Sequence, residues 1–230
     1  MLAVDKPEVL LMAGEPVMEE ESGVEPALLE PTPEAPDSDP LEANFRRLVR
    51  YLRQIQPREL AKQLMVLAFE LKDDAPDGSW VGLKRAPAGR RMHHNREGGL
   101  VQHILQMIEF ALMIYHDNPQ PFKGVVRPSD LIIACFLHDL HKARACFRED
   151  PAGRAKGTPF EYLPDVGKQL PNDVMTLWLV NQAGIKLTQD QINAVILAEG
   201  GYSLYRHQER SKLAVLVSMA DEYSALVLRK

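Results

Sequence analysis

The sequence predicts an all-α fold. From Leu41 onward, apolar residues recur at intervals of three and four, as in Leu60, Leu64, Leu67 and Leu71, which is the period of a helix with one buried face. No segment alternates apolar and polar residues for long enough to indicate a sheet. No internal repeat is visible, so a bundle of distinct helices is expected.

Two leading helices are expected within residues 41–72, because Pro57 interrupts the helical period between them. A loop rich in Gly, Pro and Arg follows over about residues 73–99. A long apolar helix then begins, and Asn118-Pro119 is expected to end it, because the residue before a proline is pushed out of helical geometry.

Further helices are expected in the second half of the chain. One begins near Pro128, where Ser129 is expected to cap it, and has its core from Leu131 to Leu140. Thr188 and Gln191 have the spacing of a capping box, in which side chains and backbone amides pair reciprocally. After a connection rich in Pro and Gly, the remaining helices are expected over residues 172–183 with Gly184 as stop, from Thr188 onward, and over roughly 209–228.

The first 40 residues differ in composition from the rest. They contain eleven acidic residues against one lysine and seven of the 17 prolines, so their charge of −10 leaves about +5 on the remainder of a chain whose net charge is −5. This composition predicts a disordered, acidic, Pro-rich tail over residues 1–40, followed by a helical domain over 41–230. Two apolar islands, at residues 9–12 and 27–29, are either a docking motif for a partner protein or incidental.

Several classes of protein are excluded by composition. No apolar run approaches the roughly 20 residues needed to cross a bilayer. The acidic N-terminus lacks the basic start of a signal peptide, so a cytoplasmic location is expected. Cys135 and Cys146 are too few for a disulfide framework. A charge of +5 on the body favours an anionic substrate but is too modest to indicate duplex binding.

The strongest chemical signal is His138-Asp139, which ends a run of seven apolar residues. An imidazole and a carboxylate buried there need a cation or a hydrogen-bond network to satisfy them. Lys142 follows on the same helical face and is placed to neutralise a phosphate. The plain alternative is a helix end that faces water, as is expected for His116-Asp117 before Asn118-Pro119.

Three other places carry polar groups beside apolar runs. His103 lies near the start of the long helix, after a polar loop that ends in Gly98-Gly99. Asp221 follows a mostly apolar stretch of the last helix, and Glu199 ends the helix that begins at Thr188. Taken one at a time, each residue also has an explanation without a functional site: a histidine in a loop, an aspartate that faces solvent and a glutamate at a helix end.

Taken in order, His103, His138-Asp139 and Asp221 resemble the H…HD…D signature of the HD-domain metal-dependent phosphohydrolases. The resemblance covers about residues 90–228. Its entry motif, in which His93-His94, Gly98-Gly99-Leu100 and His103 follow one another, is similar to that of HD-domain 3′-to-5′ exoribonucleases and of HD proteins from phages and mobile elements.

The resemblance implies a helical bundle in which four residues bind one divalent metal. These implied ligands are His103, His138, Asp139 and Asp221. Mixed imidazole and carboxylate ligands suit Mn²⁺, Fe²⁺, Co²⁺, Ni²⁺ or Zn²⁺ better than Mg²⁺. The metal would polarise a phosphoryl oxygen and lower the pKa of a bound water. Asp139 would also orient that water, and Lys142 would stabilise phosphate charge.

Other positions are candidates for binding the substrate or assisting the reaction. A cationic loop, formed by Arg90, Arg91, His93, His94 and Arg96, is either a grip for a phosphodiester or triphosphate or a solvated basic stretch. Dinuclear relatives place extra histidines where this chain has Ala198-Glu199-Gly200-Gly201, so a second metal held by histidines is not expected. Glu199 is instead a candidate oxygen ligand or water-positioning base.

The expected function is hydrolysis of nucleotides or short single-stranded oligonucleotides by metal-activated water. The nucleic-acid-binding barrel that precedes the HD domain in the exoribonucleases has no counterpart, because no strand-rich segment lies upstream. The alternative is a non-catalytic module that binds metal or nucleotide and recruits a protein partner through the acidic tail. The leading helices at 41–72 either cover the bundle or pair with another copy, so the oligomeric state is open.

Overall fold

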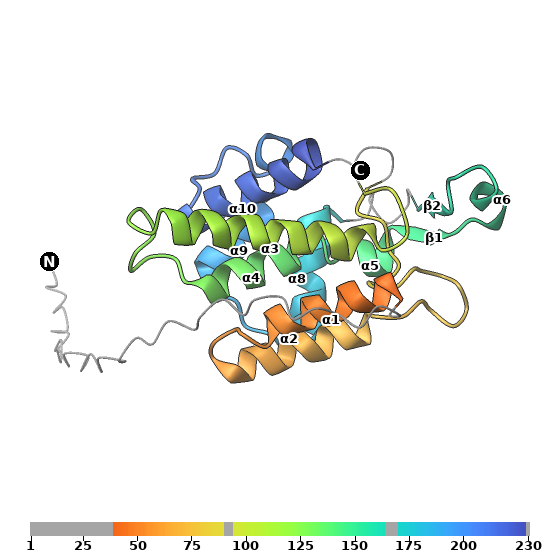
Figure 1. Ribbon diagram of the computed structural model, residues 1–230, viewed down its shortest axis with the longest axis horizontal. Coiled ribbons are helices and arrows are strands. Elements are labelled where there is room, and N and C mark those ends of the chain that lie inside the picture. The colour runs from red at the N-terminus through yellow and green to blue at the C-terminus, as the bar shows by residue number, and fades with distance from the viewer. Residues whose placement is uncertain (1–38, 90–93, 164–169, 229–230) are drawn as a thin grey trace, which may run out of the picture. The chain divides into compact units, whose positions relative to one another are not determined.

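The computed structural model describes residues 39–89, 94–163 and 170–228 (Figure 1). The predicted tail, apart from its last two residues, and three members of the predicted cationic loop, Arg90, Arg91 and His93, lie outside these ranges. The long helices are α1 (Pro40–Leu52), α2 (Arg58–Glu70), α3 (Gly99–Asp117), α4 (Pro128–Leu137), α8 (Asn172–Gln182), α9 (Gln189–Ile196) and α10 (Lys212–Glu222). The predicted all-α class is confirmed.

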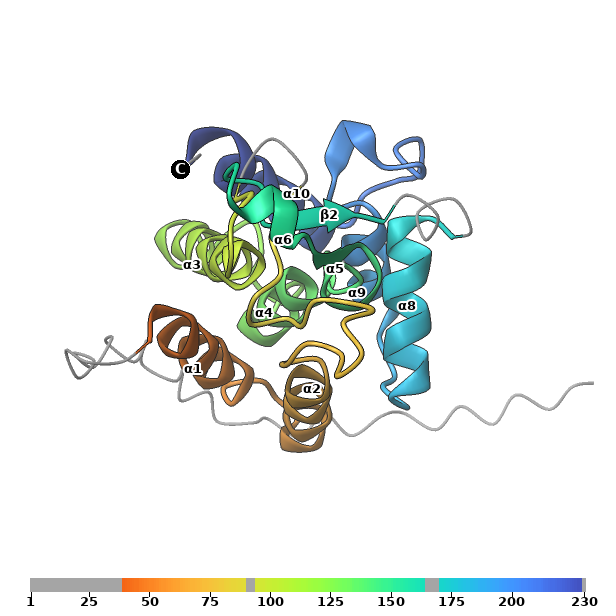
Figure 2. The same ribbon diagram turned by 90° about the vertical axis from the view of Figure 1, so that its right-hand side faces the viewer.

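Helix α4 is the centre of the bundle. It packs against α1, α3, α9 and α10, and every residue from Ser129 to Leu137 is buried. A helix that is apolar all round is stable only where other elements cover all its sides. Figure 2, which looks nearly along α1, α2 and α3, shows α3 and α4 between the α1 and α2 pair and α10. The residues that follow α4 therefore emerge from the interior of the bundle.

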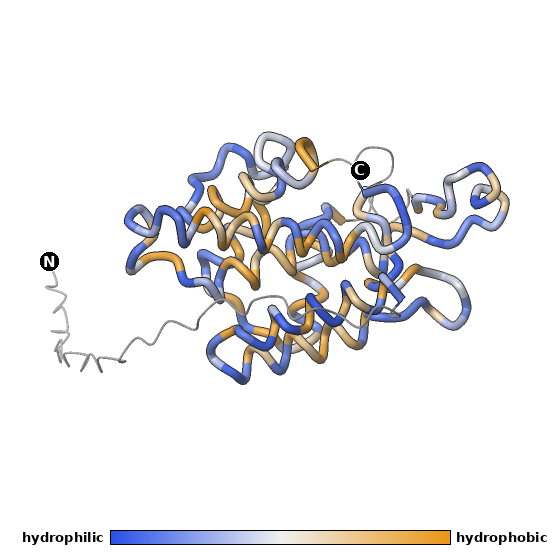
Figure 3. Tube along the Cα trace, viewed as in Figure 1, coloured by the Kyte–Doolittle hydropathy of each residue, from blue (hydrophilic) through white to orange (hydrophobic). Residues whose placement is uncertain are grey.

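The leading helices each bury one face. Hydrophobic and hydrophilic residues alternate turn by turn along α1 and α2 in Figure 3. Phe45, Leu48 and Leu52 of α1 and Leu64 of α2 are almost fully buried. The 41–72 segment thus covers the bundle, and α1 contacts both α3 and α4. Asp39 accepts a hydrogen bond from the Leu41 backbone amide and caps α1. Helix α1 therefore begins at Pro40, the last residue of the expected tail.

Two glycines bring the loop before α3 close to the bundle. Gly98 has a φ of 74°, a conformation that glycine adopts without steric cost. A Cβ at Gly99 would lie 1.9 Å from the backbone oxygen of His94, which is closer than any side chain permits. Gly98-Gly99 therefore permits the loop to fold back until His94 lies against the first turns of α3.

The expected helix ends are partly correct. Thr188 and Gln191 form the predicted capping box, with hydrogen bonds of 3.2 and 2.9 Å. The Ser129 cap is wrong: the Ser129 hydroxyl accepts a hydrogen bond from the Gln56 backbone amide at 2.9 Å, because Ser129 is turned toward the connection between α1 and α2. Helix α4 also ends at Leu137 rather than Leu140.

The connection between α4 and α8 contains structure that the sequence did not indicate. A short helix α5 (Lys142–Ala145) leads into a hairpin of β1 (Phe147–Glu149) and β2 (Phe160–Tyr162), with α6 (Pro151–Arg154) at its tip. Strands of three residues are too short to produce a recognisable alternation. At the other end of the chain, α10 begins at Lys212, capped by Ser211, and continues as a π-helical turn, η2 (Tyr223–Val227).

No helix in the described ranges is both long and apolar enough to span a membrane.

Arg85 connects three segments around the hairpin. Its guanidinium pairs with Glu97 at 2.5 Å, with Glu149 at 2.8 Å and with Asp74. We expect Arg85→Met to lower the free energy of unfolding by about 2 kcal/mol, because the partly buried Asp74 and Glu97 and the more exposed Glu149 lose their common partner. Denaturant titration measures this effect.

Arg148 provides the matched control, since it pairs with Glu161 at 2.7 Å where both side chains are about half exposed. Arg148→Met is expected to cost less than about 1 kcal/mol. Equal effects of the two substitutions would show that Arg85 is an ordinary surface ion pair.

Candidate metal centre

Four side chains from three helical segments converge on one point. His103 comes from α3, His138 and Asp139 follow directly after α4, and Asp221 is near the end of α10. The Nε2 atoms of the two histidines lie 3.2 Å apart. Asp139 Oδ2 lies 3.3 Å from His138 Nε2 and 3.8 Å from His103 Nε2, and Asp221 Oδ1 lies 3.1 Å from His103 Nε2. The four positions singled out in the sequence are therefore brought together.

The cluster is almost completely removed from water. The side chains of His103, His138 and Asp139 are at most 4% exposed, and that of Asp221 is 16% exposed. Helix α4, which His138 and Asp139 follow, is buried and packs against α1, α3, α9 and α10, which accounts for this shielding. Polar groups at this depth must be satisfied by one another, by a proton or by a cation.

Hydrogen bonds on the outer side of each ring define which nitrogen carries the proton. His138 Nδ1 donates to the Cys135 carbonyl oxygen at 2.8 Å. His103 Nδ1 lies 2.8 Å from Ser224 Oγ, and the Ser224 hydroxyl in turn donates to Gln106 Oε1 at 2.8 Å. Because the Ser224 proton is used for Gln106, Ser224 Oγ accepts from His103 Nδ1. Both imidazoles thus present an unprotonated Nε2 to the centre.

The donor set fits a divalent transition metal. Two imidazole nitrogens and two carboxylate oxygens face one another, and these are ligand types that a divalent transition metal accepts. Atoms bound to one ion at about 2.1 Å lie roughly 3 to 4 Å from each other, in agreement with the distances here. Among the described residues, His103, His138 and Asp139 form a buried group whose ligand atoms all lie within 4.8 Å of one another.

Local charges favour an ionised carboxylate at Asp139. Burial opposes ionisation, but the Lys142 ammonium and then His138 hold the pKa of Asp139 well below its usual range. Burial likewise opposes the charged form of Lys142, yet the Asp139 carboxylate, which its Nζ contacts, raises the pKa of Lys142. The pair therefore stays ionised at neutral pH. The predicted location of Lys142 beside Asp139 agrees with this geometry.

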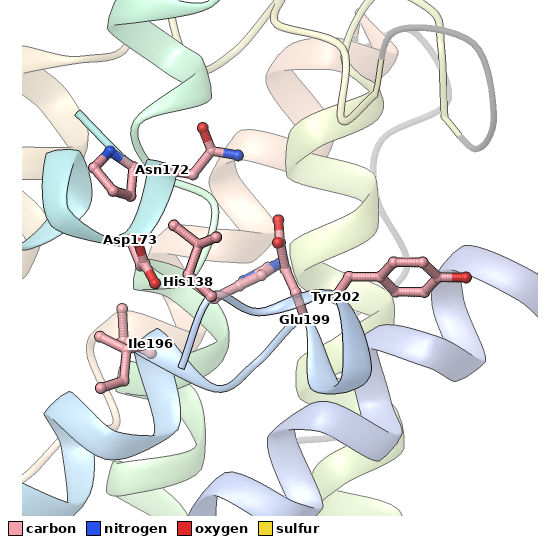
Figure 4. Close-up of a pocket in the computed structure, with 9 residues that line it drawn as sticks. His138, Asn172, Asp173, Ile196, Glu199 and Tyr202 are labelled. Carbon is pink, nitrogen blue, oxygen red and sulfur yellow. The ribbon is translucent and has the colours of Figure 1, made fainter. Parts of the chain in front are cut away.

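Two cavities open beside the cluster and share Glu199 and Tyr202. One, of about 250 Å³, is also lined by Asp139, Lys142 and Asp221. The other, of about 210 Å³, is also lined by His138 (Figure 4). Although Glu199 is exposed as a residue, partial desolvation, followed by the negative charge of Asp139, raises the pKa of its carboxyl group. Glu199 thus lies beside the centre, and its role there stays a prediction.

The described part of the cationic loop does not line these two cavities. Arg96 lines a separate cavity of about 510 Å³, and its guanidinium lies 2.5 Å from Gln102 Oε1. His94 is buried with its ring centre 5.6 Å from that of His103, and burial, followed by the nearby His103, lowers the pKa of His94 to about 4. A neutral imidazole would not attract a phosphate by charge, and phosphate binding by His94 and by Arg96 stays a prediction.

Sequence reasoning missed the residues that support the ligands. Ser224 and Gln106 hold His103, and Gln106 also hydrogen-bonds His94. One signal was present: Ser224 is a polar residue three positions after Asp221 in the last helix, so both lie on one helical face. His141 is also buried and contacts Thr176 Oγ1 through Nδ1 at 3.1 Å.

The comparison pair His116-Asp117 behaves as expected. Both residues lie at the end of α3, where Asn118 ends the helix, and Asp117 is exposed. They take no part in the cluster around His103. A His-Asp dipeptide alone therefore does not indicate a metal site. A His-Asp dipeptide that directly follows a buried apolar helix does.

A helical bundle that buries two histidines and an aspartate in this way fits the HD superfamily. Among curated proteins, the chain is similar to the dihydroneopterin 2′,3′-cyclic phosphate phosphodiesterase of Methanocaldococcus jannaschii. The two are 31% identical over 109 residues, which are 46% of this chain and 43% of the relative, so the match spans less than half of either protein. No protein-family model matches the chain, and no solved structure matches it significantly.

Proposed function

We propose that this protein is a metal-dependent phosphohydrolase that cleaves phosphodiesters of nucleotides or of related small molecules. The observation that carries the proposal is the convergence of one ligand atom each from His103, His138, Asp139 and Asp221 in a space almost closed to water. A bound divalent transition metal supplies Lewis-acid polarisation of a phosphoryl oxygen and lowers the pKa of water.

The protein's own residues would bind and orient the substrate around that centre. Lys142 carries a positive charge at the edge of the 250 Å³ cavity, where it can attract a phosphate, while it also fixes the Asp139 carboxylate. Glu199 lines both cavities, and because its pKa is raised, its carboxyl group is a candidate for accepting or donating a proton there.

A diester is favoured over a monoester because two cavities beside the centre share Glu199 and Tyr202. In a dinucleotide, phosphorus carries a nucleoside on each of two ester oxygens, and two cavities offer a place for both; in a 2′,3′-cyclic phosphate both ester oxygens belong to one ribose, so one cavity is enough. The similarity to a cyclic phosphate phosphodiesterase supports the same class of bond. Nucleoside 2′,3′-cyclic phosphates and dinucleotides are therefore the first substrates to test, ahead of longer oligonucleotides.

The direct test is an assay of metal-stripped protein before and after reconstitution with Mn²⁺. The panel includes nucleoside 2′,3′-cyclic phosphates, dinucleotides and nucleoside monophosphates. We expect metal-dependent hydrolysis of the diesters. Protein that binds one equivalent of metal but hydrolyses none of these compounds would instead support the non-catalytic binding module. An interaction of that module with a protein partner would involve residues 1–38, outside the described ranges.

The outer hydrogen bond of His103 provides a finer test of the metal site. Ser224→Ala removes the acceptor of His103 Nδ1, so the ring loses the partner that fixes its orientation. We expect metal affinity to fall by about 10-fold to 100-fold. Competition with a chromophoric chelator measures this change.

Ser218→Ala is the matched control, because Ser218 is a buried serine of the same helix outside the His103 hydrogen bonds. It is expected to retain wild-type metal affinity. Equal affinities of the two variants would show that Ser224 does not position His103 for metal.

A further inference from the structure

The 210 Å³ cavity beside His138 has the character of a site for one flat ring. Its apolar walls come from Val195, Ile196 and Leu204, and its polar edge comes from Asn172 and Asp173 at the start of α8. Figure 4 shows Asp173 and Ile196 on the side of the cavity away from Tyr202, with His138 between them. Pockets for drug-sized ligands usually measure about 300 to 1,000 Å³, so this cavity suits a single ring system rather than an oligonucleotide.

Asp173 has unused capacity to accept hydrogen bonds. Its Oδ1 accepts from the Val174 backbone amide at 3.0 Å. Within the described ranges no cation pairs with its carboxylate, and partial burial raises the pKa of Asp173. A carboxylate has about four lone-pair positions, so most of its acceptor capacity is available to a molecule in the cavity.

We propose that this cavity binds the ring of the substrate through a 2-amino-4-oxopyrimidine edge, as is present in guanine and in pterins, with Asp173 accepting from its two adjacent N–H groups. The proposal rests on the proposed function, because His138 and Glu199 line the same cavity and connect the ring to the phosphate position. Paired N–H donors match a carboxylate in a bidentate arrangement, with charge assistance for both bonds.

Other common rings are less suited to this edge. Adenine and cytosine place a ring nitrogen that accepts hydrogen bonds next to their amino group, and that lone pair would face the negative carboxylate. Hypoxanthine retains the ring N–H but lacks the 2-amino group, so it can make only one of the two bonds. Guanine against hypoxanthine is therefore the most specific comparison for Asp173.

A helix-stabilising role for Asp173 is separable from ligand binding. Asp173 is the second residue of α8, where a negative charge stabilises the helix N-terminus. Asp190 is the second residue of α9 but does not line the cavity. Asp190→Asn therefore reproduces the loss of helix-terminal charge without changing the cavity.

The test measures binding of guanosine and inosine 5′-monophosphates to the metal-loaded protein by isothermal titration calorimetry. We expect wild type and Asp190→Asn to prefer the guanosine compound by roughly tenfold, and Asp173→Asn to lose the preference. A neopterin monophosphate arm distinguishes a pterin ligand from a guanine ligand. Equal affinities in wild type, or a preference that survives in Asp173→Asn, would overturn the proposal.

This measurement does not depend on turnover. If the protein hydrolyses no phosphodiester but retains a guanosine preference that Asp173→Asn removes, the proposed function fails and the ring site stands. If the protein hydrolyses cyclic phosphates of guanosine and inosine equally well and binds them equally, the ring site fails and the phosphohydrolase stands.

Discussion

Asp139→Asn is expected to lower kcat for the best phosphodiester by on the order of 10³-fold or more, which corresponds to about 4 kcal/mol of transition-state stabilisation. The substitution keeps the size of the side chain but removes the negative charge that faces His103 and His138 and pairs with Lys142. It removes a ligand of the proposed ion and leaves a buried ammonium without its partner. Steady-state assays in saturating Mn²⁺ measure the effect.

Asp117→Asn is the matched control, because Asp117 also follows a histidine but lies exposed at the end of α3. It is expected to retain wild-type kcat. Circular dichroism spectra of both variants establish that they are folded. If folded Asp139→Asn protein hydrolysed the substrate at the wild-type rate, the observed turnover would not arise at this centre.

Metal is expected to stabilise the fold by several kcal/mol. A ligand present at about 1,000 times its dissociation constant stabilises the state that binds it by roughly 4 kcal/mol. For a domain of this size, that corresponds to an increase in Tm of about 8 to 16 °C. The physical reason is that the ion binds two carboxylates and two imidazole nitrogens that the fold already holds together in a nearly closed space. Thermal unfolding of stripped protein with and without Zn²⁺ or Mn²⁺ measures the shift.

Asp221→Asn tests whether that stabilisation comes from the cluster. Asp221 contributes a carboxylate oxygen 3.1 Å from His103 Nε2. The variant is expected to show a much smaller increase in Tm on addition of metal. The same increase in both proteins would place the metal elsewhere in the chain.

The bundle and the cluster were accessible to sequence reasoning for one physical reason. Apolar periodicity predicts which helices are buried, and a polar dyad that directly follows a buried helix, as His138-Asp139 does, must be satisfied in the interior. The spacing from Gly98-Gly99 to His103 added the entry loop. That His103 and Asp221 meet the dyad was implied by the resemblance to the HD-domain phosphohydrolases, and periodicity and spacing alone left it open.

Features that depend on packing in three dimensions were not predictable in the same way. Ser129 has the sequence context of a helix cap, but packing turns its hydroxyl toward Gln56. His94 belongs to a basic, polar loop, yet the close approach at Gly99 buries it against His103. Asp173 follows Pro171 at a helix start like many aspartates, and only the arrangement of α8 beside α9 places it in a cavity.

Metal content is the most direct test of whether the four side chains form one site. We predict that protein purified without added metal and then saturated with Mn²⁺, Fe²⁺ or Zn²⁺ retains one equivalent per chain after removal of free ion, as measured by elemental analysis. His103→Gln and Asp221→Asn, which alter ligands from different helices, should each retain far less. Wild-type protein that retains no metal, or variants that retain as much as wild type, would contradict a single centre built from α3, the end of α4 and α10.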